Sequence, residues 1–169
     1  MNQIWALLAL FALLHSSAVP VSAGSVDIVS DESWTVEGSR YIGKSVGTWV
    51  HSAWTSIPGA KWIWKSTLIE NPGGEESYMF VKEFDIFGFP TSSLLTVAAD
   101  NNFAIILNGN FVAATQDGSF GRAKTFDLLS KTIQGRNVVQ VIVTNYAQGG
   151  GNSYSNPAGL LFKLTVNFN

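Results

Sequence analysis

Hydrophobic and polar residues alternate one by one along several stretches of this chain, and no stretch carries a long helical repeat of apolar positions. The clearest alternation runs from Leu160 to Phe168, where every second residue is apolar and most residues between them are polar. Shorter stretches with the same period cover residues 95–99, 103–107 and 139–143. A period of two places one face of a strand in a core and the other in water. The pattern therefore predicts an all-β chain whose antiparallel sheets pack as a sandwich.

Turn residues separate these stretches at short intervals. Asn108-Gly109 directly follows an apolar strand, and this pair supplies the two left-handed backbone conformations of a type I′ turn. It predicts a hairpin at that point. Further turns are expected at Pro58-Gly59, Asn71–Gly74 and Gln134-Gly135. Short strands with this spacing are typical of a jelly-roll or related sandwich of about eight strands.

Two segments leave alternatives open. Phe80, Lys82 and Phe84 share one face of a regular strand, so either a bulge turns Lys82 aside or its ammonium extends to the sheet edge. Residues 125–130 are expected to form a single helical turn or a loop, with Phe126 and Leu129 in the core. Each alternative is compatible with the predicted sandwich.

The amino terminus carries an apolar run, Ile4–Leu14, that is too short to cross a bilayer. Small residues follow it, and Val21-Ser22-Ala23 resembles a signal-peptidase site. We expect residues 1–23 to be a signal peptide, with cleavage after Ala18 as the second choice and a retained signal anchor as the alternative. The remaining residues, 24–169, have the length of one domain that can fold without cysteine. The protein is therefore expected to be secreted, extracellular or at the cell surface.

The charge of the chain is low and nearly balanced. Ten Lys and Arg residues against twelve Asp and Glu residues give a net charge of −2, and no basic run occurs. Nucleic-acid binding requires clustered Lys and Arg that displace counterions from phosphates, and anionic membranes attract polybasic segments. We therefore expect no nucleic-acid partner and, once the signal is removed, no insertion into a membrane.

Several short segments occur in an order that is typical of one group of sandwich domains. They are Pro58–Trp64, Phe80–Phe84, Ala99–Gly109, Phe126–Leu128 with Gly135–Asn137, and Asn156–Leu161. Together they resemble the galactose-binding-domain-like superfamily over most of residues 30–168. That superfamily includes many carbohydrate-binding modules and the sugar-binding jelly-rolls attached to family 2 glycosidases and rhamnosidases. The resemblance implies a galactose-binding-domain-like jelly-roll that accompanies catalysis rather than performing it.

The residues themselves offer little for catalysis. His51 is the one histidine left after removal of the signal, and we place it in an alternating strand. With no cysteine, a single imidazole cannot anchor a zinc site, and a Ser-His-Asp triad would have to be built around it. Glycoside hydrolysis requires two facing carboxylates, but Asp85, Asp100 and Asp127 lie beside turns or strand ends, where carboxylates commonly cap backbone N–H groups. We expect no enzyme and keep a hydrolase only as a third hypothesis.

Asp100, Asn101 and Asn102 gather oxygen-bearing side chains in one loop. Calcium prefers oxygen ligands, and many modules that resemble this chain carry a structural calcium. The alternative is that Asp100 and Asn101 close a turn through bonds from side chain to backbone. The sequence thus names calcium at Asp100 and Asn101 as the candidate cofactor and leaves both alternatives open.

Sugars are bound by a flat aromatic side chain together with planar amide or acid groups. Residues 145–156 contain both in an uncharged loop between the last two strands, which places the loop at one end of the sandwich. The alternative is a disordered loop or one that contacts a partner. Trp34 and Trp54 are further aromatic residues near turns, whereas Trp62 and Trp64 are expected to be structural. The predicted ligand-binding residues are Trp54, Asn145, Tyr146, Asn152, Tyr154 and Asn156.

Two functions from different classes follow from these predictions. The first is a secreted lectin-like module that binds glycans or glycoproteins without catalysis. The second is a structural subunit of a cell-surface or extracellular assembly, favoured by the low charge and the aromatic content of 12%. Only the second predicts self-association that rises with protein concentration.

Overall fold

A computed structural model describes residues 23–116 and 118–169, and in them the chain forms twelve strands and one short 3₁₀ helix. Of the predicted signal peptide, residues 1–23, all but Ala23 lies outside the described residues. The elements are β1 (Gly24–Val29), β2 (Thr35–Gly38), β3 (Tyr41–Lys44), β4 (Val46–Gly47), β5 (Ile63–Trp64), β6 (Glu76–Ile86), β7 (Pro90–Asp100), β8 (Asn102–Leu107), β9 (Asn110–Ala114), β10 (Lys124–Asp127), η1 (Leu129–Lys131), β11 (Gly135–Asn145) and β12 (Gly159–Phe168).

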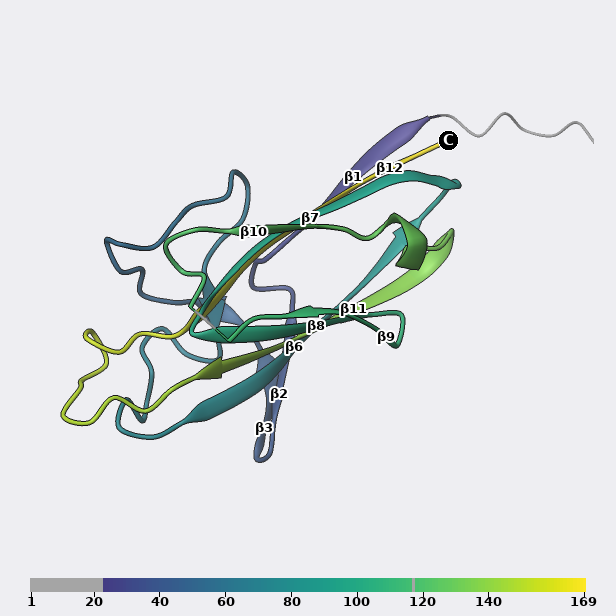
Figure 1. The fold of residues 1–169 in the computed structure, drawn as a ribbon. Coiled ribbons are helices and arrows are strands. Elements are labelled where there is room, and N and C mark those ends of the chain that lie inside the picture. Colours follow the sequence, from purple (N-terminus) through teal and green to yellow (C-terminus); the bar gives the residue numbers. More distant parts are fainter. Residues whose placement is uncertain (1–22, 117) are drawn as a thin grey trace, which may run out of the picture.

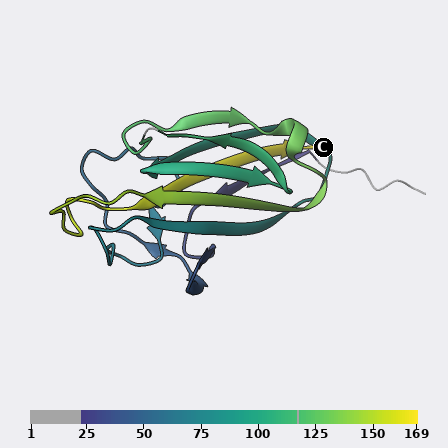
Figure 2. The same cartoon turned by 60° about the horizontal axis from the view of Figure 1, so that its bottom comes forward.

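The strands form two antiparallel sheets that lie against each other as the layers of a sandwich (Figures 1 and 2). The first sheet has the order β10-β7-β12-β5-β4, with β1 also paired to β12, and the second has the order β3-β2-β6-β11-β8-β9. The predicted all-β antiparallel sandwich is confirmed. It has more than the expected eight strands because several are only two to four residues long, too short to show an alternating pattern.

The main core lies between the two sheets, and the alternating stretches supply it as predicted. Leu160, Phe162, Leu164 and Val166 of β12 are fully buried, and every second residue of β8 and β11 faces them from the other sheet. At the end of the β8–β9 hairpin, Asn108 has a φ of 53° and Gly109 a φ of 76°. Both residues are therefore left-handed, as a type I′ turn requires.

A second, smaller core covers the outer face of the first sheet at one end. Ala98 of β7 and Leu161 of β12 point away from the main core and are buried instead by Trp54, Ile57 and Trp62. All three residues lie in the long loop of residues 48–62. At this end, β7 and β12 are thus buried on both faces, and the loop is fixed to the sheet by apolar contacts.

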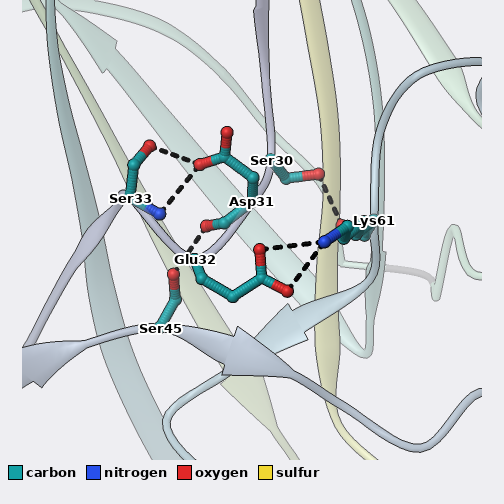
Figure 3. Close-up of polar contacts among 6 residues, drawn as sticks. All are labelled: Ser30, Asp31, Glu32, Ser33, Ser45 and Lys61. Carbon is teal, nitrogen blue, oxygen red and sulfur yellow. Dashed lines mark hydrogen bonds and ion pairs between the residues drawn. The ribbon is translucent and has the colours of Figure 1, made fainter.

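The link between β1 and β2 carries the chain from the first sheet to the second and also holds the end of this loop (Figure 3). Ser30 Oγ donates a hydrogen bond to the Lys61 carbonyl at 2.6 Å, and Lys61 Nζ lies 2.9 Å from Glu32 Oε1. Ser33 N donates to Asp31 Oδ1 at 2.9 Å, which closes the turn between the two strands. Lys61 directly precedes Trp62, so these contacts help to position the second core.

The expectation for residues 125–130 was wrong in two respects. Residues 124–127 form strand β10, which pairs with β7, and the helical turn begins only at Leu129. Leu128, not Leu129, fills the core: Leu128 is fully buried, whereas Leu129 is 38% exposed. The reason is local, because Asp127 Oδ1 accepts a hydrogen bond from Leu129 N at 2.9 Å and turns the chain immediately after the strand.

The structure also decides between the two alternatives for Lys82. Strand β6 pairs with β11 along its whole length without a shift of register, so no bulge is present there. Strand β2 pairs with β6 only as far as Val81, and the ammonium of Lys82 extends past this point to Ser33 Oγ. The charged end of the side chain therefore reaches the sheet edge, as the second alternative expected.

Candidate functional site

Three loops meet at one end of the sandwich, around the point where β7 ends: the loop of residues 48–62, the loop around Phe120 between β9 and β10, and the loop between β11 and β12. Gly159, the first residue of β12, pairs with Asp100, the last residue of β7, so the loop that leads into β12 ends beside Asp100. Strand β11 ends at the same end, and the loop between β11 and β12 projects from it, next to the loop of residues 48–62 (Figure 1). The predicted position of residues 145–156 at an end of the sandwich agrees with this arrangement.

These loops enclose a pocket of about 210 Å³, which we call the loop-end pocket. Asp100 and Asn101 contribute from the end of β7, and the other walls come from the three loops. The residues that matter for its chemistry are His51, Trp54, Asp100, Asn101, Phe120, Gln148 and Asn156.

Asp100 is the buried carboxylate of this pocket, with only 6% of its surface exposed. It lies two residues beyond Ala98 and so shares the outer face of the first sheet with it. Trp54 Nε1 donates a hydrogen bond to Asp100 Oδ2 at 3.1 Å, and Asn101 Nδ2 donates to Oδ1 at 2.7 Å. Burial raises the pKa of Asp100 to about 6, although both hydrogen bonds act to lower it.

Two predicted amide residues tie the loop of residues 145–156 to the pocket. Asn101 Oδ1 accepts a hydrogen bond from Tyr146 N at 2.7 Å. Asn156 Nδ2 donates to the carbonyl of Tyr146 at 2.9 Å and to that of Pro72 at 2.8 Å. Both amide side chains therefore bind backbone of the surrounding loops, and this fixes the wall of the pocket that they line.

The other two predicted asparagines also serve the loop. Asn145 is fully buried. Asn152 Oδ1 accepts hydrogen bonds from Tyr154 N at 2.9 Å and from Ser155 N at 3.1 Å, which closes a tight turn beneath Tyr154. Asn145 Nδ2 donates to the Tyr146 carbonyl at 3.4 Å, so both asparagines bind backbone of the loop. Contact of either side chain with a ligand stays a prediction.

The two predicted tyrosines are the exposed members of the set. Tyr146 is 44% exposed, and its hydroxyl is hydrogen-bonded to Asn102 Nδ2. Tyr154 is 56% exposed, and its ring packs edge-on against Trp49 with 5.4 Å between ring centroids. Trp49 in turn lies 5.8 Å from the ring of His51, which lines the pocket. Trp49, His51 and Tyr154 thus form an aromatic rim beside the loop-end pocket.

The predicted tryptophans are more deeply placed than a ligand platform would be. Trp54 is largely buried and lies against Trp62, with ring centroids 4.2 Å apart, so it presents only part of itself to the pocket. Trp34 is fully buried in the main core. Trp62 and Trp64 are buried too, in agreement with the structural roles expected of them.

Sequence reasoning missed Trp49, Phe120 and Gln148 and misplaced His51. His51 does not lie in a strand but in the loop of residues 48–62, where its Nδ1 accepts a hydrogen bond from Ala53 N at 3.1 Å. Loops of this kind carry no periodic signal. Only the density of aromatic residues between positions 49 and 64 could have indicated that this segment covers part of the sheet.

The contacts of Asp100 and Asn101 bear on the expected calcium. Each Asp100 oxygen and the Asn101 oxygen already accept one N–H group, so one lone pair on each oxygen remains for a further donor or a cation. Among residues 23–116 and 118–169, no three His, Asp or Glu side chains gather as a metal site would require. Calcium binding at Asp100 and Asn101 remains a prediction that a chelator experiment tests.

The sequence matches no protein-family model and no curated protein. Solved structures do share its fold. The FMN-binding β-glucuronidase from Facaelibacterium prausnitzii is 17% identical with a TM-score of 0.54, and the similarity covers 86% of this chain and 23% of that chain. A Ruminococcus gnavus β-glucuronidase is 10% identical with a TM-score of 0.53, covering 84% and 28%. A glycosyl hydrolase family 2 member from Bacteroides cellulosilyticus is 15% identical with a TM-score of 0.52, covering 85% and 20%.

The chain thus spans about a quarter of the length of these enzymes, and at such low identity the likeness concerns the fold. At that level, the likeness to these glycosidase structures agrees with the antiparallel sandwich that the sequence predicted. Within the described part of the chain, no helix is long and apolar enough to cross a bilayer.

Proposed function

We propose that this protein is a secreted, non-catalytic module that binds carbohydrate at the loop-end pocket and its aromatic rim. The observation that carries the proposal is a pocket that holds the buried carboxylate of Asp100 and is also lined by His51, whose ring leads through Trp49 to the exposed ring of Tyr154. Sugar recognition needs this combination, because a pyranose has an apolar face for a ring and hydroxyl groups for planar acceptors.

The pocket supplies the polar part of such recognition. The Asp100 carboxylate accepts two N–H groups and keeps acceptor capacity on both oxygens. The amide of Gln148 adds a group that can both donate and accept, and the Nε2–H of His51 adds a donor, because its Nδ1 already accepts the Ala53 N–H. A sugar hydroxyl is itself both donor and acceptor, so these three side chains are matched to it.

The absence of catalysis in this proposal rests on the composition of the pocket. Glycoside hydrolysis uses a pair of carboxylates about 5–10 Å apart, and Asp100 is the only acidic residue that lines the loop-end pocket. Export is proposed from the apolar run Ile4–Leu14 and the small residues after it. Enzymes named for carbohydrate substrates contain domains of this fold, which is compatible with a carbohydrate ligand.

The test is a glycan array probed with protein purified from the medium of a secreting host, first with calcium and then with a chelator. We expect selective binding that Tyr154→Ala or Trp49→Ala reduces at least tenfold. Thermal unfolding of each variant shows whether the fold is retained. A blank array from folded protein would contradict the proposal, and binding that the chelator abolishes would assign calcium a role.

One observation favours the second candidate, a subunit that self-associates. Phe87 and Phe89, in the connection between β6 and β7, are 77% and 68% exposed, and Ile133 lies exposed at the same end. This end is opposite the loop-end pocket, because Ile86 pairs with Gly135 and not with Asn145. Exposed apolar clusters often mark contacts between proteins.

A further variant, Phe87→Ala, separates the two candidates. Light scattering over a wide range of protein concentration should show self-association if the second candidate is right, and Phe87→Ala should weaken it. Phe87→Ala should leave glycan binding unchanged, since it removes an exposed ring far from the pocket. A protein that stays monomeric at all concentrations and binds glycans would support the first candidate and exclude the second.

A further inference from the structure

We infer that the loop-end pocket accepts a single neutral sugar unit and excludes sugars that carry a carboxylate. This inference rests on the proposed carbohydrate function and adds to it the chemical class of the ligand. It follows from the charge, the hydrogen-bonding capacity and the size of the pocket.

The charge of the pocket is negative and has no cation to balance it. Asp100 is nine-tenths buried, and neither Lys nor Arg is among the residues that line the pocket. A second carboxylate placed in this space would meet the buried carboxylate of Asp100 at short range, where like charges repel.

The hydrogen-bonding capacity of Asp100 gives the same preference. Trp54 and Asn101 each donate one N–H group to it, one to each oxygen, so the lone pairs that remain can only accept. The ligand must therefore present donors, which the hydroxyl groups of a neutral sugar do. An ionised uronic acid offers acceptors at the position of its carboxylate, and no donor there.

The size of the pocket limits what enters it. Its volume of about 210 Å³ is below the roughly 300–1,000 Å³ that is usual for pockets that take drug-sized ligands. At about 30 Å³ for each water molecule, it holds on the order of seven waters. One sugar ring fits such a space, and the next unit of a longer glycan would lie on Trp49 and Tyr154 outside it.

The test measures binding of matched pairs of sugars by calorimetry or by competition on the array at pH 7.5. Each pair differs only at C6: methyl galactoside against the methyl glycoside of galacturonic acid, and methyl glucoside against the methyl glycoside of glucuronic acid, both acids with a free carboxylate. At least one of the two neutral sugars should bind. We expect that sugar to bind at least tenfold more tightly than the uronic acid of its pair. Asp100→Asn keeps the shape of the side chain and removes the charge, so it should reduce this ratio to less than threefold.

The outcomes separate this inference from the proposed function. Equal or tighter binding of the uronates would overturn the inference and leave the carbohydrate function standing. Failure of every glycan to bind folded protein would overturn both. If Asp100→Asn does not fold, the ratio measured on the unaltered protein decides, with Phe87→Ala as a control that should keep the ratio unchanged.

Discussion

Trp54 and Asp100 lie 46 positions apart in the chain and are joined by a hydrogen bond of 3.1 Å from the indole Nε1 to the carboxylate Oδ2. The bond connects the loop of residues 48–62 to the end of β7. The hydrogen bond therefore holds the loop of residues 48–62, which forms one wall of the loop-end pocket, against the buried carboxylate of Asp100. Because the carboxylate is buried, the indole N–H is one of the few groups that replace the water molecules it loses on folding.

Trp54→Phe tests this connection directly. The change keeps an aromatic ring against Trp62 but leaves the buried carboxylate with one donor fewer. We expect the free energy of unfolding at pH 7.5 to fall by about 1–3 kcal/mol, as measured by denaturant titration. The loss should shrink at pH 5, where a protonated Asp100 needs the donor less. Trp49→Phe is the control, and a comparable loss in that variant would show that the hydrogen bond is not the cause.

The stability of the protein should depend on pH through Asp100. Its pKa is raised from 3.8 to about 6 in the folded state, so the folded protein binds this proton more tightly than the unfolded chain. The contribution of Asp100 to stability is thus full below about pH 4 and is lost as the pH rises through 6. At about 1.4 kcal/mol for each pKa unit, the total is on the order of 3 kcal/mol.

Asp100→Asn isolates this effect. Other carboxylates act in the opposite direction; the pKa of Asp27, for example, is lowered by hydrogen bonds from Lys163 and Thr165. The difference in unfolding free energy between Asp100→Asn and the unaltered protein cancels such contributions. We expect Asp100→Asn to become relatively more stable between pH 4 and pH 7. A difference that does not change with pH would show that Asp100 does not titrate in this range.

Variants of Asn152 test whether this side chain supports the loop or contacts the glycan directly. Its Oδ1 holds the backbone N–H groups of Tyr154 and Ser155, so Asn152→Ala should loosen the turn beneath Tyr154 and weaken glycan binding. Asn152→Asp keeps the acceptor oxygen and should retain binding within about threefold, since an exposed Asx turn accepts either residue. If both variants lose binding equally, the amide touches the ligand. Calorimetric titration of the two proteins with one array hit distinguishes these results.

Leu128 and Leu129 are neighbours with opposite surroundings, and they form a matched pair. Leu128 is fully buried, so Leu128→Ala should lower the free energy of unfolding by about 2–5 kcal/mol. Leu129 is 38% exposed, and Leu129→Ala should change it by about 0.5 kcal/mol or less. Denaturant titration of both variants is sufficient. Similar losses would mean that η1 packs differently from the arrangement described here.

The strands that the sequence predicted are those with one buried and one wet face. Leu160 to Val166 in β12 and the strand before Asn108-Gly109 have a clear period of two, and their inward residues are buried as expected. The hairpin was predictable because few residues other than Asn and Gly adopt left-handed conformations at low cost.

The pocket was less predictable, because it depends on contacts between loops. Tyr154 and Asp100 were identified from their residue types, but Trp49 and His51 lie in a segment without periodicity. The asparagines predicted as ligand contacts bind loop backbone, as Asn156 does with Pro72 and Tyr146, and their contact with a ligand stays a prediction. An amide that closes a turn and an amide that binds a sugar have the same signature in a sequence.

The place of β12 has a consequence for how the chain folds. It is the last strand along the chain, yet it lies inside the first sheet and is the partner of β1, with Gly24 paired to Phe168. Until residues 159–168 are available, β1 has no neighbour in that sheet and β7 has one open edge. Pairing over such separations in sequence is slow, and open edges favour aggregation in the meantime. During synthesis, the first sheet can therefore close only after residues 159–168 have left the ribosome.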